Sequence, residues 1–260
     1  MKKEREPAPI LQSLRVRNLN MSVIPPLISS QAEEVRSRDN QLLEPAALAP
    51  RLFFHACKRC LDLLLALLML VLLMPLWLFI AALIKIDSRG PVLFVNRAVG
   101  QNGRNFRLYK FRSMHPAERS DVERADVARN ILNGTPTTYV GGKAVYKTAL
   151  AERTRITRVG RFLRRTSLDE LPQLWNILRG DLSFVGPRPS LPDEVSLYTD
   201  WQKQRLLVPQ GLTGLYQVSA RNRVSIEEMI RIDLEYIRRR SLWLDITILC
   251  RTPRAMLSGV

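Results

Sequence analysis

Cysteine and histidine are scarce in this chain of 260 residues, which has three of the first and two of the second. So few ligands exclude a disulfide framework and a zinc site built from paired cysteines and histidines, and they indicate a reducing compartment. Cys57 and Cys60 do form a Cys-x-x-Cys. No second pair and no following βαβ pattern supports a redox or metal role for them.

Acidic residues are also few: 24 of them face 40 basic residues, for a net charge of +16. The excess is concentrated, because residues 51–115 contain ten basic residues and two acidic ones. A focused positive charge attracts a polyanionic partner. This basic block surrounds the most apolar run in the chain.

That run, residues 63–84, has no charged side chain. As a helix it would reach ~33 Å, enough for a hydrocarbon core of ~30 Å. Pro75 removes a backbone donor in its middle and predicts a bend or break there. The run starts too far from the N-terminus for a cleaved signal peptide.

Two topologies fit the apolar run. General statistics favour a straight signal-anchor that tolerates its proline. The basic residues on both flanks give no orientation by the positive-inside rule. A re-entrant helix that turns near Pro75 instead leaves both flanks beside anionic headgroups on one membrane face. The flanking residues are Arg51, Lys58, Arg59, Lys85, Arg89 and Arg97.

The rest of the chain divides by its patterning into an arm, a hairpin and several helices. Residues 1–50 are polar and punctuated by proline, which indicates a flexible arm. Residues 91–96 and 106–111 predict two strands joined through a Gly-Gln-Asn-Gly turn. Residues 119–132 predict a helix, and residues 133–143 a mobile loop.

Three further helices follow from apolar spacing. The first carries the stripe Leu171, Leu174, Trp175 and Leu178, and Gly180 is placed as its C-terminal cap. Residues 226–237 predict an amphipathic helix, and residues 241–249 a third helix in a membrane interface.

The start of the first of these helices is ambiguous. Residues 167–170 match a capping box, which places Pro172 inside the helix. Asp169 as N-cap instead places the proline in the first turn, where amide hydrogens are unpaired anyway. We favour the later start.

Asp169 and Glu170 are adjacent carboxylates that follow four arginines: Arg158, Arg161, Arg164 and Arg165. On helix statistics alone they are a cap and a first-turn acid favoured by the helix dipole. The same placement suits chemistry on phosphate, because a helix N-terminus near guanidinium groups attracts it. A carboxylate there could attack phosphorus, provided a divalent cation screens the like charges.

Two arginines lie in glycine- and proline-bearing segments. Residues 186–189, Gly-Pro-Arg-Pro, hold Arg188 between two prolines that restrict the backbone, although an exposed turn explains the pattern equally well. Residues 209–222 form a glycine-bearing stretch that leads to Arg221. Taken alone, this stretch is weak evidence for a site.

Taken together, these segments resemble the bacterial sugar transferase family, the monotopic polyprenyl-phosphate phosphoglycosyl transferases. The resemblance covers about residues 53–258 and rests on eight ordered segments. These are residues 58–62 (KRCLD), the Pro75-broken helix, 91–97 (PVLFVNR), 109–114 (YKFRSM), 161–173 (RFLRRTSLDELPQ), 180–189 (GDLSFVGPRP), 209–222 (PQGLTGLYQVSARN) and 233–236 (DLEY).

The resemblance implies an α+β, mostly helical fold in three parts: the arm at residues 1–50, a re-entrant membrane helix at 51–87, and a cytoplasmic catalytic domain with interfacial helices at 88–260. It reverses the preference for a straight anchor. It implies residence in the bacterial cytoplasmic (inner) membrane, with the catalytic domain facing the cytoplasm. No further membrane helix precedes residue 51 in this sequence, so the resemblance is to the minimal form of the family.

The implied activity is transfer of a sugar-1-phosphate from a UDP-sugar to polyprenyl (undecaprenyl) phosphate, with release of UMP. This reaction initiates exopolysaccharide, O-antigen or glycoconjugate synthesis. By resemblance Asp169 is the nucleophile that forms a covalent aspartyl-phosphosugar intermediate, Glu170 assists it, and Mg²⁺ binds at Asp169.

The resemblance also assigns substrate contacts to five basic residues. Arg164, Arg188 and Arg221 would hold phosphate or donor groups, and Lys58 and Arg59 would contact the lipid phosphate. Residues 219–222 read Ser-Ala-Arg-Asn where the family pattern is Asn-Gly-Arg-Asn, so the sugar stays undefined. The oligomeric state is open and compatible with a homodimer.

Two other classes compete with this interpretation. A glycosyltransferase that moves a sugar without its phosphate usually holds metal on Asp-x-Asp, and no two aspartates here are separated by a single residue. A membrane-associated basic module for nucleic acid or anionic lipid predicts a diffuse basic face with stacking aromatics. The arginines instead converge on a carboxylate pair, so we expect no nucleic-acid partner.

Overall fold

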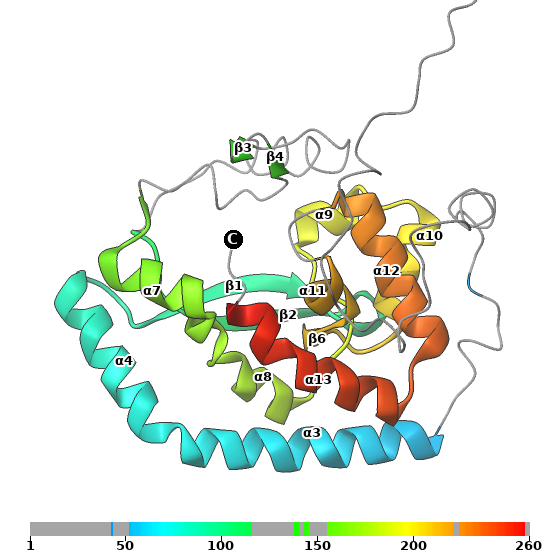
Figure 1. The fold of residues 1–260 in the computed structure, drawn as a ribbon, viewed down its shortest axis with the longest axis horizontal. Coiled ribbons are helices and arrows are strands. Elements are labelled where there is room, and N and C mark those ends of the chain that lie inside the picture. Colours follow the sequence, from blue (N-terminus) through cyan, green and yellow to red (C-terminus); the bar gives the residue numbers. More distant parts are fainter. Residues whose placement is uncertain are drawn as a thin grey trace, which may run out of the picture. The chain divides into compact units, whose positions relative to one another are not determined.

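The computed structural model describes residues 43, 52–115, 138–140, 143–145, 155–220 and 224–257, all within the unit that spans residues 42–260 (Figure 1). The arm predicted at residues 1–50, apart from Leu43, lies outside the described residues, as does the helix predicted at 119–132. Leu43 is buried in the main core, and its backbone N–H donates to the side-chain carbonyl of Gln204.

The apolar run folds as two helices, α3 (Leu52–Leu72) and α4 (Met74–Asp87). Their axes meet at a bend of 61°. Pro75 is in the first turn of α4, where its missing N–H removes no helical hydrogen bond, so the break falls just before the proline. By length and composition no single described helix is sufficient to cross a bilayer, whereas α3 and α4 together are sufficient.

The predicted hairpin is confirmed, with longer strands than expected. Strand β1 (Leu93–Val99) pairs antiparallel with β2 (Asn105–Phe111). The turn between them contains the short 3₁₀ helix η2 (Gln101–Gly103), in which Asn102 has φ 55° and Gly103 φ 77°. Asparagine and glycine adopt positive φ at the lowest cost, which explains why the sequence signal was reliable.

A side chain occupies the other edge of β2. The buried Asn176 accepts a hydrogen bond from the N–H of Tyr109 (3.1 Å) and donates to the carbonyl of Arg107 (2.6 Å). It satisfies the strand's backbone as a third strand would. Asn176 lies in α8 (Gln173–Arg179), so this contact fixes α8 against the hairpin.

The start predicted for this helix is wrong in both of its versions. Helix α7 (Arg158–Thr166) ends at Ser167, whose φ of 57° reverses the chain. A 3₁₀ turn, η4 (Leu168–Glu170), follows, and α8 begins only after Pro172. Asp169 is therefore neither an N-cap nor inside an α-helix. The predicted C-terminal cap at Gly180 is confirmed, with φ 85°.

The remaining elements complete an α+β, mostly helical fold. The predicted helices at residues 226–237 and 241–249 are confirmed as α12 (Ile226–Arg239) and the longer α13 (Leu242–Leu257). Strand β3 (Thr138–Val140), inside the loop predicted at residues 133–143, pairs with β4 (Lys143–Val145), which begins at the end of that loop. The others are β5 (Ser183–Val185) parallel to β6 (Gly211–Thr213), α9 (Pro192–Ser196), α10 (Asp200–Lys203), the 3₁₀ helix η5 (Gln204–Leu207) and α11 (Leu215–Ser219).

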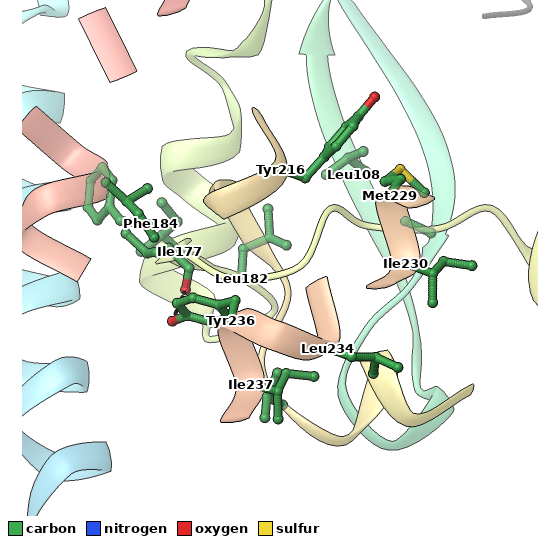
Figure 2. Packing of buried hydrophobic residues seen from close by; sticks show 14 of the residues in the cluster. Leu108, Ile177, Leu182, Phe184, Tyr216, Met229, Ile230, Leu234, Tyr236 and Ile237 are labelled. Carbon is green, nitrogen blue, oxygen red and sulfur yellow. Dashed lines mark hydrogen bonds between the residues drawn. The ribbon is translucent and has the colours of Figure 1, made fainter. Parts of the chain in front are cut away.

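Two apolar clusters hold these elements together. In the larger one the buried face of α12 packs against residues of α8, β2 and β5 (Figure 2). Its members labelled there include Ile230, Leu234, Ile237, Ile177 and Phe184. The smaller cluster, Ile80, Ile84, Phe111 and Leu163, joins α4 to β2 and α7. Turn η4 lies between α7 and α8, so both clusters determine its place.

Candidate active site

The carboxylates of Asp169 and Glu170 lie on η4, and they have different partners. Lys110 of β2 donates to Oε1 of Glu170 at 3.0 Å, and both side chains are about one-third exposed. No ion pair to Asp169 is found among the described residues. Adjacent positions of a 3₁₀ turn point in different directions. One carboxylate is therefore engaged by a lysine, while the other is available for chemistry.

The environment of Asp169 disfavours its charge. The pKa of Asp169 is raised from 3.8 to about 6, because burial and, secondly, repulsion from Glu170 outweigh the opposing effects of Lys110, Arg164 and a backbone hydrogen bond. A partly buried carboxylate with a raised pKa beside cations is a typical functional-site signature. Near neutral pH Asp169 is mostly ionised and incompletely solvated, which favours its reaction with an electrophile.

The sequence-predicted arginines have different places in the structure. Arg164 is in the last turn of α7, close enough to stabilise the ionised form of Asp169. Arg188 is exposed at the tip of the Gly-Pro-Arg-Pro segment. Arg221 lies outside the described residues, so its predicted role stays a prediction.

Lys58 and Arg59 are engaged within the protein. Lys58 is buried in α3 and forms an ion pair with Asp245 of α13, with Nζ 2.6 Å from Oδ2. Arg59 donates to the carbonyls of Ile177 (2.6 Å) and Leu178 (2.9 Å) at the end of α8. Both therefore fasten α3 to the domain, and we leave them out of the candidate phosphate site.

The segment that carries Arg188 is held by close backbone contacts. Gly186 N–H donates to the carbonyl of Thr213 (3.0 Å), and Gly211 N–H donates to the carbonyl of Pro187 (2.8 Å). A Cβ atom on Gly186 would lie 2.4 Å from the carbonyl oxygen of Pro209, so this approach requires glycine. The stretch at residues 209–214 thus supports the Arg188 segment.

Comparison with protein families gives a match over residues 53–259 to the bacterial sugar transferases. That match covers most of the chain. The chain belongs to the bacterial sugar transferase family.

Curated relatives of this family member carry related names. A protein named undecaprenyl-phosphate galactose phosphotransferase from Salmonella typhimurium is 38% identical over 200 residues, 77% of this chain and 40% of the relative. Galactosyl transferase CpsE from Streptococcus agalactiae is 38% identical over 203 residues, 78% of this chain and 42% of the relative. This chain spans about two fifths of the length of these two relatives.

Another relative matches over most of its own length. The exopolysaccharide production protein ExoY of Rhizobium meliloti is 41% identical over 199 residues, which is 76% of this chain and 84% of the relative. The aligned stretch is therefore about the same length in all three comparisons, between 199 and 203 residues. The family match at residues 53–259 includes the carboxylate pair, Arg164 and Arg188.

The carboxylate pair is chemically suited to a magnesium ion. Mg²⁺ prefers oxygen ligands and is usually bound through one or two carboxylates, with substrate phosphates and water completing its shell. Asp169 supplies such an oxygen, and the repulsion that raises its pKa is the kind a cation relieves. No group of three or more metal-binding side chains occurs among the described residues.

Several helices of this family member leave large apolar side chains exposed. On α3 and α4 they alternate with residues that face the core, so each helix has one buried and one exposed apolar face. An exposed apolar surface of this extent marks an interaction site. Its members are Leu52, Phe53, Leu61, Leu63, Leu64, Leu67, Leu68, Val71, Leu72, Met74, Leu78, Phe79 and Ile86, and Trp175, Trp243 and Ile246 on α8 and α13 are also exposed.

Sequence reasoning missed several contributors to the site. Lys110, which pairs with Glu170, lies in the predicted strand at residues 106–111, and nothing in the local pattern pointed to the carboxylate pair. Asn176 was hidden in a helix defined by its apolar stripe. Asp233 lies in the predicted helix at residues 226–237 without a role of its own there, although an acid among the apolar positions of a helix signals a cation partner.

Proposed function

We propose that the protein is a phosphoglycosyl transferase that moves a sugar-1-phosphate from a UDP-sugar to polyprenyl phosphate and releases UMP. The observation that carries this proposal is the half-buried Asp169, with its raised pKa, beside Arg164 and a second carboxylate held by a lysine. The relative named undecaprenyl-phosphate galactose phosphotransferase supports undecaprenyl phosphate as the acceptor and a sugar phosphate as the group transferred.

In the first step, an oxygen of Asp169 attacks the donor phosphorus that carries the sugar. A carboxylate–phosphorus bond forms, the bond to the bridging oxygen breaks, and UMP leaves with that oxygen. In the second step, an oxygen of polyprenyl phosphate attacks the same phosphorus. Asp169 departs as a carboxylate, and the product is a polyprenyl diphosphate sugar.

The other groups of the site stabilise charge. Arg164 favours the ionised form of Asp169 and faces the anionic phosphates, while Lys110 holds Glu170 beside the nucleophile. Mg²⁺, when held at Asp169 with substrate oxygens, would neutralise the diphosphate and permit an anionic nucleophile to approach it. Arg188 would bind phosphate or donor oxygens as a bidentate guanidinium.

We further propose that α3 and α4 form a re-entrant element that enters and leaves the inner membrane on its cytoplasmic face. The 61° bend, the exposed apolar faces and basic residues at both ends support this topology. It would keep Asp169 near the headgroups, where a lipid phosphate is found. Membrane-impermeant thiol labelling of cysteines placed at Leu52 and Ile86 tests it: neither position should react from outside intact cells after Cys57, Cys60 and Cys250 are replaced.

The activity is tested by UMP release from a panel of UDP-sugars, with protein in nanodiscs, Mg²⁺ and polyprenyl phosphate. Asp169→Asn should abolish release and capture of a radiolabelled phosphosugar on the protein. Asp200→Asn, a change at a carboxylate whose side chain is 90% exposed, is the matched control and should be fully active. Full activity of Asp169→Asn, or no release with any donor, would overturn the proposal.

A further inference from the structure

A second buried network lies behind the Arg188 segment. Arg205 of η5 is almost completely buried, as is Asp233 of α12, and Nη2 of Arg205 is 2.5 Å from Oδ2 of Asp233. The same nitrogen donates to the carbonyl of Arg188 at 2.9 Å. Nη2 of Arg205 therefore binds both the Asp233 carboxylate and the backbone carbonyl of Arg188.

The other terminal nitrogen of Arg205 reaches the end of the same segment. Nη1 donates to the hydroxyl of Ser190 at 2.8 Å and to that of Tyr198 at 2.9 Å, and these two hydroxyls are 3.1 Å apart. Ser190 is fully buried, and its carbonyl accepts from the N–H of Val99 at 2.8 Å. One guanidinium thus anchors both Arg188 and Ser190.

The prolines explain why the segment needs such an anchor. Pro187 and Pro189 have no backbone N–H, so the segment is held mainly through its carbonyls and the Ser190 hydroxyl. Gly211 binds the carbonyl of Pro187, and Arg205 binds that of Arg188. These two hydrogen bonds restrain the backbone at Pro187 and Arg188. The exposed Arg188 side chain therefore extends from a backbone with a fixed conformation.

The buried ion pair between Arg205 and Asp233 is not explained by stability alone. Well-packed apolar residues in place of a buried ion pair are often as stable or more stable. Here burial raises the pKa of Asp233 to about 6, and both Arg205 and the nearby Arg188 oppose that rise. Asp233 thus lies within electrostatic reach of two arginines, one buried and one exposed.

We propose that Arg205 and Asp233 are positioning residues that orient Arg188 toward the donor phosphates. This inference rests on the proposed function. Asp233 holds the Arg205 guanidinium, which in turn fixes the Arg188 carbonyl and the Ser190 hydroxyl, so the backbone that carries Arg188 cannot turn away. Preorganisation of this kind preserves the geometry that a phosphate-binding arginine needs.

A double-mutant cycle tests the coupling. Asp233→Asn should lower kcat/KM for the donor by about tenfold, chiefly through KM, because Arg188 remains present but misoriented. When Arg188 is already Gln, Asp233→Asn should cost no more than about twofold, since the group it positions is gone. Asp245→Asn, which alters another buried carboxylate paired with a cation, is the matched control, and its effect should add to that of Arg188→Gln.

Hydrogen exchange gives a readout that does not depend on activity. In Asp233→Asn the amides of Val99 and Gly211, which bind the segment's carbonyls, should exchange faster than in the wild type, whereas Asp245→Asn should leave them unchanged. Additive effects in the cycle, or unchanged exchange at both amides, would overturn the positioning role. If the wild type releases no UMP, the proposed function fails, and the exchange experiment still decides whether Arg205 and Asp233 hold the segment.

A milder variant covers the case in which Asp233→Asn does not fold. Ser190→Ala leaves the ion pair intact and removes only the hydroxyl that Arg205 binds. It should raise the donor KM about two- to threefold and show the same loss of effect when Arg188 is Gln. An unchanged KM for this variant, with a normal melting temperature, would contradict the proposal.

Discussion

Replacing the proposed nucleophile should make the protein more stable. Asp169→Asn removes a carboxylate whose pKa rises from 3.8 to about 6 on folding. Each unit corresponds to about 1.4 kcal/mol, so the ionised group lowers the free energy of unfolding by about 3 kcal/mol. Because Asp169 is partly exposed, screening by solvent reduces the expected gain to about 2 kcal/mol.

The sign of this effect depends on pH. Because the folded protein binds the Asp169 proton more tightly than the unfolded chain does, the penalty is absent below about pH 4, grows as the pH rises toward 6, and is complete above it. Thermal unfolding in detergent with EDTA should place the Asp169→Asn melting temperature about 4–8 °C above wild type at pH 8. At pH 4 the two proteins should melt together.

The control for this measurement is Asp200→Asn, whose carboxylate is exposed and should change stability little at either pH. An Asp169→Asn protein that is no more stable than the wild type at pH 8 would refute the reasoning. So would a gain that is the same at pH 4 and pH 8, because it would not come from the carboxylate's charge.

Three further changes have expected outcomes. Glu170→Gln removes the repulsion that raises the pKa of Asp169, so the acid limb of the pH–kcat/KM profile should move to lower pH; an upward shift would contradict this. Lys58→Met leaves Asp245 buried without its cation and should lower the free energy of unfolding by about 3 kcal/mol, measured by denaturant unfolding; a neutral effect would show that the pair is dispensable. Asn176→Ala leaves two backbone groups of β2 unpaired and should cost about 2–3 kcal/mol in the same assay; unchanged stability would mean that water replaces the amide.

Local patterns predicted the broken apolar helix, the hairpin and the helices α8, α12 and α13. The hairpin follows from its Asn-Gly turn, which tolerates positive φ, and Gly180 ends α8 for the same reason. Helix α12 follows from apolar spacing, since its buried positions repeat with the helical period. Pro75 predicted the break between α3 and α4 because no helix interior accommodates proline without loss of a hydrogen bond.

The turn that carries Asp169 was beyond local prediction. A capping box at Ser167 and the proline at 172 gave opposing signals, and the chain resolves them with a left-handed Ser167 and a 3₁₀ turn. Neither feature has a strong local signature. The turn is stabilised instead by Lys110, which comes from a strand some 60 residues earlier and pairs with Glu170.

The sequence alone determined the broken apolar helix, the hairpin, the helices α12 and α13, and the resemblance of the ordered motifs, because apolar period, glycine and proline act over a few residues. The tertiary structure decided which charges serve the site. Lys58 and Arg59 lie in a basic motif, yet packing of α3 engages them with Asp245 and with α8. The sequence assigned no role to Lys110 or Arg205. The fold places Lys110 beside the carboxylate pair and Arg205 against the backbone of Arg188. Charges interact through space, so their roles depend on which distant segments the two apolar cores bring together.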